Sequence, residues 1–99
     1  ERRAMSGEGF VFVRVVVDGR KGRLVGTPVV ESRGWGEPED RDSWHSDVAE
    51  AVTEAVASAV GDGQREPREL ERLTRRATGR LVSRRTGRRP ALVPTVEVR

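Results

Sequence analysis

A run of nine residues near the N-terminus, Phe10–Asp18, limits most strongly how this chain can fold. The run is dominated by β-branched and aromatic residues, which is typical of a β-strand. Side chains of a strand alternate between the two faces of a sheet. One face of this strand carries Val11, Val13, Val15 and Val17, and the other carries Phe10, Phe12 and Val16, interrupted by Arg14. Because both faces are apolar, we expect both to be covered.

Two further apolar runs predict the other strands. Leu24–Val30 follows a turn at Gly19–Gly22, so a hairpin with the first strand is the simplest arrangement. Within it, Pro28 lacks a backbone N–H, which suits an edge strand or a bulge. The last run, Ala91–Val98, contains Pro94, and we expect it to be irregular or to lie at an edge of the sheet.

Two segments between these runs have helical periodicity. In the first, valines recur at every fourth residue from Val48 to Val60. Residues 34–47 before it are predicted to form an acidic loop, and Ser46 or Asp47 is predicted to cap the helix. Trp44 of that loop is expected to pack against the sheet or a helix. The second helix is expected to begin near Pro67 and to end at Gly87. Its predicted buried stripe is Leu70, Leu73, Ala77 and Leu81.

The predicted order is therefore ββααβ, an α+β fold in which two helices pack on one face of a three-stranded sheet. Two helices can cover only one face. We expect the face with Phe10, Phe12 and Val16 to contact a second copy of the chain or another domain. Residues 1–8 are charged, contain Ser6-Gly7 and open on Glu rather than Met, so we interpret them as the end of an interdomain linker and residues 9–99 as the domain.

The composition excludes several kinds of chemistry. A chain of 99 residues forms one small core, which cannot also enclose a large buried active site. The length therefore argues against a self-sufficient enzyme. There is no cysteine, and His45 is the single histidine, so thiolate zinc sites and histidine clusters are excluded. We interpret His45 as a solvated loop residue, and we assign no catalytic, cofactor-binding or metal-binding residue. No apolar run is long enough to span a membrane, and we expect a cytoplasmic protein.

Charge is unevenly distributed along the chain. Residues 1–64 hold 8 basic and 12 acidic side chains, whereas residues 65–99 hold 11 arginines and 4 glutamates, giving net charges of −4 and +7. An anionic partner such as RNA is one reading of this asymmetry, and ion pairs between the two halves are the other. The candidate RNA contacts are Arg75, Arg76, Arg84, Arg85, Arg88 and Arg89. No aromatic residues lie among them, which favours a solvated helix face over a surface that stacks bases.

Three segments resemble the C-terminal domain of ribonuclease J. They are Glu8-Gly9-Phe10-Val11, Glu31-Ser32-Arg33-Gly34-Trp35 and Arg88-Arg89-Pro90-Ala91-Leu92-Val93-Pro94, and the resemblance extends from about Arg2 onward. The chain departs from the family at Ala91, where a larger apolar residue is usual, and in the acidic stretch after Trp35. The family comprises bacterial ribonucleases of the metallo-β-lactamase fold with an inserted β-CASP domain, which act as 5′ exonucleases and as endonucleases.

The resemblance implies a supporting role. Ribonuclease J needs a cluster of His and Asp residues to hold zinc or another divalent metal, and no such cluster is present here, so no catalytic residue is carried over. In the family, the small C-terminal domain supports oligomerisation and full activity. The resemblance therefore implies a homodimer contact or a contact with the parent enzyme's catalytic domains, and access to RNA through the parent. The alternative is an independent, arginine-rich nucleic-acid-binding module.

Overall fold

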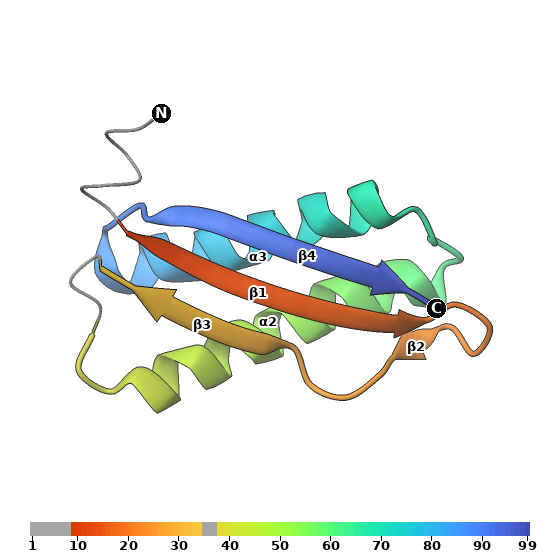
Figure 1. Ribbon diagram of the computed structural model, residues 1–99, viewed down its shortest axis with the longest axis horizontal. Coiled ribbons are helices and arrows are strands. Elements are labelled where there is room, and N and C mark those ends of the chain that lie inside the picture. The colour runs from red at the N-terminus through yellow and green to blue at the C-terminus, as the bar shows by residue number, and fades with distance from the viewer. Residues whose placement is uncertain (1–8, 35–37) are drawn as a thin grey trace.

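The computed structural model describes residues 9–34 and 38–99. The elements follow in the order β1 (Phe10–Asp18), β2 (Arg23–Leu24), β3 (Val29–Arg33), α2 (Arg41–Gly61), α3 (Pro67–Thr86) and β4 (Ala91–Val98). One sheet forms the first layer and the two helices form the second, on a single face of the sheet (Figure 1). The predicted α+β class and the ββααβ order are confirmed, with the second strand divided in two. The predictions for residues 1–8 and 35–37 lie outside the described residues.

Strand β1 is the centre of the sheet and pairs with all three other strands. Strand β4 runs parallel to it on one side, from the pair Phe10 and Ala91 to the pair Val17 and Val98. Strands β3 and β2 are antiparallel to β1 and share its other side, one at each end. The expected single strand over 24–30 is therefore wrong. Gly26 has a φ of 71° and Pro28 has no N–H to donate, so the ladder breaks between Val25 and Val29.

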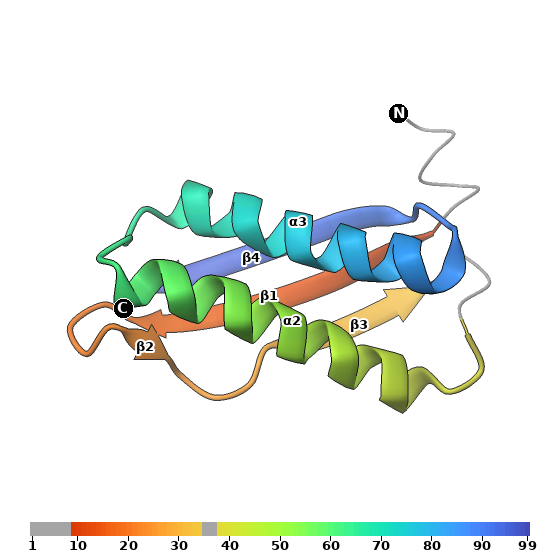
Figure 2. The same cartoon turned by 180° about the vertical axis from the view of Figure 1, so that it is seen from behind.

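The core lies between the sheet and the helices (Figure 2). Strand β1 contributes a valine at every second residue and α2 a valine at every fourth residue. Two residues of strand span about 6.6 Å and four residues of helix about 6 Å, so the two rows have nearly the same spacing. Val11, Val13, Val15, Val17, Val48, Val52, Val56 and Val60 are all at most 2% exposed. The predicted valine stripes are confirmed.

Helix α2 begins earlier than predicted, at Arg41 rather than after Asp47. The carbonyl of Asp40 accepts the first bonds of the helix, from the N–H groups of Ser43 at 3.0 Å and Trp44 at 3.2 Å. Trp44 lies four residues before Val48 and is 1% exposed, so it extends the buried stripe by one turn. The prediction that Trp44 packs into the fold is confirmed, but it does so from the helix. The predicted acidic loop is wrong over residues 41–47, which are helical, and the predicted caps at Ser46 and Asp47 are wrong as well.

Helix α3 has the predicted ends but a different buried stripe. Gly87 has a φ of 73° and donates its N–H to the Ser83 carbonyl at 2.7 Å, which ends the helix. The fully buried residues are Leu70, Thr74, Thr78 and Val82, whereas Leu73, Ala77 and Leu81 are only partly buried. The Thr74 hydroxyl donates to the Leu70 carbonyl at 2.8 Å, and this bond lets a polar residue occupy the core.

Asp18 gives the turn after β1 a dependence on pH. One of its carboxylate oxygens accepts the N–H groups of Lys21 and Arg20, each at 3.0 Å, and the bond from Lys21 is the main cause that lowers the pKa of Asp18. A lowered folded-state pKa stabilises the fold above the ordinary pKa and loses this effect as the pH falls through the folded value.

We therefore expect Asp18→Asn to flatten the loss of stability below about pH 4, the range in which aspartates titrate. The measurement is the urea midpoint of both proteins at a series of pH values from neutral to acid. A variant with the same acid dependence as the unchanged chain would contradict this role of Asp18.

Candidate functional site

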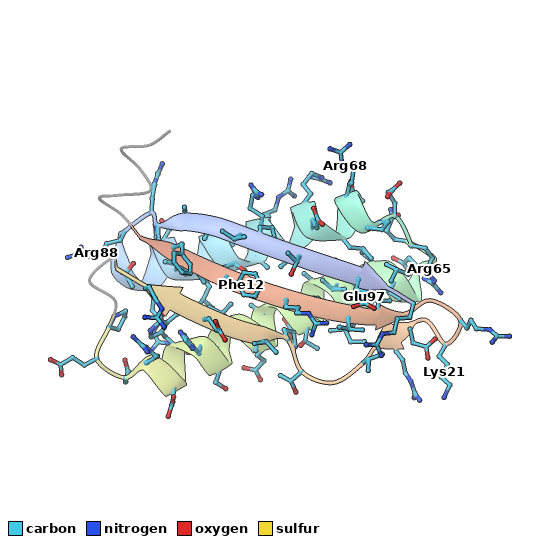
Figure 3. All side chains as sticks on the ribbon, viewed as in Figure 1. Phe12, Lys21, Arg65, Arg68, Arg88 and Glu97 are labelled. Atoms are coloured by element: carbon cyan, nitrogen blue, oxygen red, sulfur yellow. The ribbon has the colours of Figure 1, made fainter. Side chains whose placement is uncertain are left out.

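The face of the sheet opposite the helices carries no other element of the described chain, and Figure 3 shows Phe12 and Glu97 on this side. We call it the open face. Strand alternation and the pairing register define its members. They are Phe10, Phe12, Arg14 and Val16 on β1, Val29, Glu31 and Arg33 on β3, and Ala91, Val93, Thr95 and Glu97 on β4.

An apolar strip runs along the middle of the open face. Phe10, Phe12 and Val16 are half-buried by their neighbours, and the flanking Val29 and Val93 are 46% and 39% exposed. Phe12 lies between Glu31 on β3 and Val93 on β4 in the register. The structure thus brings together the three residues predicted as an interface, on the face that the helices leave open.

The open face carries charges of both signs. Arg14 contacts Glu97 across β1 and β4, with 3.4 Å between guanidinium and carboxylate. Glu97 is also 3.2 Å from Arg99, and the remaining charged members of the face are Glu31 and Arg33. The open face therefore carries charges of both signs, with Arg14, Arg33 and Arg99 beside Glu31 and Glu97. Two copies can meet through this face with opposite charges placed against one another.

Sequence reasoning missed Val29 and Val93 as members of this face. Both lie on the strands that flank β1, and their side depends on how each strand is paired. A shift of one residue would move them to the helix side. The alternation within each strand is a signal, but it fixes a face only when the register is known.

The six arginines predicted to contact RNA do not form one surface. Arg85 forms ion pairs with Asp40 and Asp47, the pairing with the acidic segment that the sequence left open as an alternative. Arg84 lines a hollow between the two helices that also contains Glu54. Arg75 and Arg76 are exposed along α3, whereas Arg88 and Arg89 lie beyond its end. Only this last pair lies beside a hollow without a carboxylate.

Comparison with known proteins identifies the family. The model of the ribonuclease J C-terminal domain matches residues 1–98 of this chain. The chain belongs to this family. It is therefore an accessory domain of ribonuclease J, and the resemblance seen in the sequence is confirmed. No curated protein matches the chain.

His45 has a structural place in this ribonuclease J domain. It lies in α2, and its Nε2 is 2.9 Å from the Ser32 hydroxyl on β3. The rings of His45 and Trp44 meet edge to face at 4.5 Å. The prediction of a solvated loop histidine is wrong because the helix starts before it and turns it toward the sheet. Ser32 is 4% exposed, so this pair joins β3 to α2 rather than presenting an accessible nucleophile.

The described part of the ribonuclease J domain is expected to hold no metal ion of its own. Within residues 9–34 and 38–99, no group of three or more His, Asp or Glu side chains is placed to hold a metal ion. Asp40 and Asp47, which come from the acidic segment, contact Arg85 instead. Neither α2 nor α3, the helices that the structure describes, is apolar over a length that could cross a membrane.

Proposed function

We propose that this domain is a non-catalytic assembly domain that joins two copies of its parent ribonuclease through the open face. The observation that carries the proposal is the uncovered apolar strip of Phe10, Phe12 and Val16, flanked by Val29 and Val93. A sheet with helices on one face only is stable in water when its other face is polar. An apolar strip with charges of both signs at its sides is instead typical of a surface that is buried in an assembly.

The size of the strip is sufficient to drive association. Phe10 and Phe12 are half-buried within the domain, so it is the whole strip, with Val16, Val29 and Val93, that can bury on the order of 300 Å² in a partner. At about 25 cal/mol per Å² this contributes several kcal/mol before the cost of association. A second copy is favoured over the catalytic domains because the face carries both signs of charge, so that Arg14 of each copy can approach the glutamates of the other.

Catalysis belongs to the other domains of the parent enzyme in this proposal. They would hold zinc or another divalent metal, bind the RNA and cleave it in the cytoplasm. This domain would set how many catalytic units act together.

Phe12→Glu tests the proposal. It places an unpaired carboxylate in the centre of the contact and should convert a dimer into a monomer, with at least a tenfold weaker dimerisation constant. The measurement is sedimentation equilibrium at several concentrations, with circular dichroism to check that the fold is retained. Ala57→Glu is the matched control, because it adds the same charge on an exposed position of α2 and should leave the dimer intact. A monomeric parent chain at high concentration, or equal effects of both variants, would contradict self-association through this face.

A further inference from the structure

A hollow lies between the C-terminal end of α3 and the start of β4. We call it the α3–β4 pocket. Its floor consists of Val82, Pro90 and Leu92, and Arg88 and Arg89 lie at its rim. Its volume is about 320 Å³, which is in the range of small-ligand sites. In Figure 3 Arg88 lies at the end of the molecule where α3 passes into β4.

The backbone shapes this pocket. Gly79 lies on its wall, and a β-carbon at this position would be only 3.0 Å from Cδ1 of Leu92, so the glycine lets α3 lie close to β4. Gly87 ends the helix in a left-handed conformation and is followed by the two arginines and the buried Pro90. The arginines are therefore held between two fixed points, the helix cap and the first residue of the sheet.

The charge of the pocket distinguishes it from four other hollows of the described chain. The hollow between the two helices contains Glu54, and the one at the α2–α3 connection contains Asp62 and Glu69. The two hollows beside β3 contain Glu31 and Asp42. The α3–β4 pocket combines two arginines with an apolar floor and has no carboxylate in its lining.

We propose that the α3–β4 pocket binds one nucleotide of single-stranded RNA. The flat face of a base fits against Val82, Pro90 and Leu92, and the guanidinium groups of Arg88 and Arg89 bind the backbone phosphates on either side of the nucleotide. The Ser83 hydroxyl on the wall offers a hydrogen bond to the base edge or to the 2′-hydroxyl. The volume admits about one nucleotide. Because the lining contains no aromatic ring for stacking, we expect the binding to be weak.

This inference rests on the proposed role as an accessory domain of a ribonuclease, which brings RNA to the domain. The pocket and the open face are nevertheless separate. Leu92 points to the helix side of β4, whereas Val93 points to the open face. Failure of dimerisation would appear as a monomer by sedimentation. Failure of nucleotide binding would leave the mass unchanged.

The test is fluorescence anisotropy with a labelled uridine decamer at low and at physiological salt. Replacing Arg88 and Arg89 by alanine removes two phosphate contacts and should weaken binding about tenfold. The salt dependence of binding should fall as well. The matched control replaces Arg75 and Arg76, which removes the same charge from an exposed part of α3 and should weaken binding about twofold. Ser83→Phe fills the pocket without changing the charge and should also weaken binding about tenfold.

Several results would overturn the proposal. Equal weakening by the two double variants would mean that the decamer is held only by general charge. Full binding by Ser83→Phe would mean that the pocket is not occupied by a base. Equal competition by a glutamate decamer would assign the pocket to an acidic protein segment. A further readout is nuclear magnetic resonance with uridine 5′-monophosphate, where the amide signals of Gly79, Ser83 and Leu92 should shift first. Shifts only on the open face, or no shifts, would contradict the site.

Discussion

Val13→Asp should unfold this domain. Val13 is 2% exposed at the centre of β1, where it is paired with Val30 on β3 and Pro94 on β4. The aspartate would have to enter the valine layer under the helices without a partner, which costs on the order of 4 kcal/mol or more. Domains of this size have a free energy of unfolding of about 5 to 15 kcal/mol. The variant should therefore lose most of its stability.

The control for this change is Ala57→Asp. Ala57 is exposed on α2, away from the open face, so an added carboxylate stays in water. We expect a change of less than about 1 kcal/mol. Circular dichroism and urea denaturation measure both variants. A cooperative unfolding transition of Val13→Asp near the midpoint of the unchanged chain would mean that the faces of β1 are assigned the wrong way round.

The repeat spacing made part of this fold predictable. The valines of β1 and α2 each follow the period of their element, and a buried row shows directly in such a pattern. Trp44 continues the same four-residue period, but the charged residues around it, Asp40, Asp42 and Asp47, concealed the first turns of α2. Their charge has a structural explanation, because Asp40 and Asp47 form ion pairs with Arg85 across the chain.

The buried stripe of α3 could not be predicted from hydrophobicity. Leu73, Ala77 and Leu81 are more apolar than Thr74 and Thr78, yet the threonines are the residues in the core. The small β-branched side chains fit where α3 lies close to β4, and Gly79 marks that close approach. The sequence shows the amphipathic helix, but its rotation is decided by the shape of the sheet against which it packs.

The two candidate sites also differ in how far the sequence predicts them. That one face of β1 stays uncovered could be predicted, because two helices cover only one side of a sheet. That this is the face of Phe10 and Phe12 is decided by the packing of the β1 valines under the helices. The α3–β4 pocket could not be predicted, because its residues belong to the end of one element and the start of another. Arg88 and Arg89 were selected from the sequence for their charge, together with four arginines that the structure places elsewhere.

Arg65 shows how one charged residue can hold several segments together. Its Nε donates to the Gly19 carbonyl at 2.8 Å, and its Nη1 donates to the carbonyls of Val60 at 2.8 Å and Gln64 at 3.0 Å. The side chain thereby joins the turn after β1, the end of α2 and the connection to α3. The Val60 carbonyl, at the end of α2, also accepts the N–H of Gly63 at 3.0 Å, so Arg65 adds a second donor to it. Figure 3 shows Arg65 near the end of β1.

We expect Arg65→Ala to lower the free energy of unfolding by about 3 kcal/mol, because it removes three hydrogen bonds from a charged donor and leaves partly buried carbonyls without it. Arg65→Lys should recover less than half of this loss. The ammonium group of lysine lacks the planar guanidinium, whose N–H groups donate in different directions from one side chain. Arg68→Ala removes the same charge from an exposed position on α3 and should cost less than about 0.5 kcal/mol. Urea denaturation gives these values, and hydrogen exchange of the Gly22 amide, which is bonded to the Asp18 carbonyl, reports the turn directly. If Arg65→Ala and Arg68→Ala had equal midpoints, the three bonds of Arg65 would contribute no more than its charge.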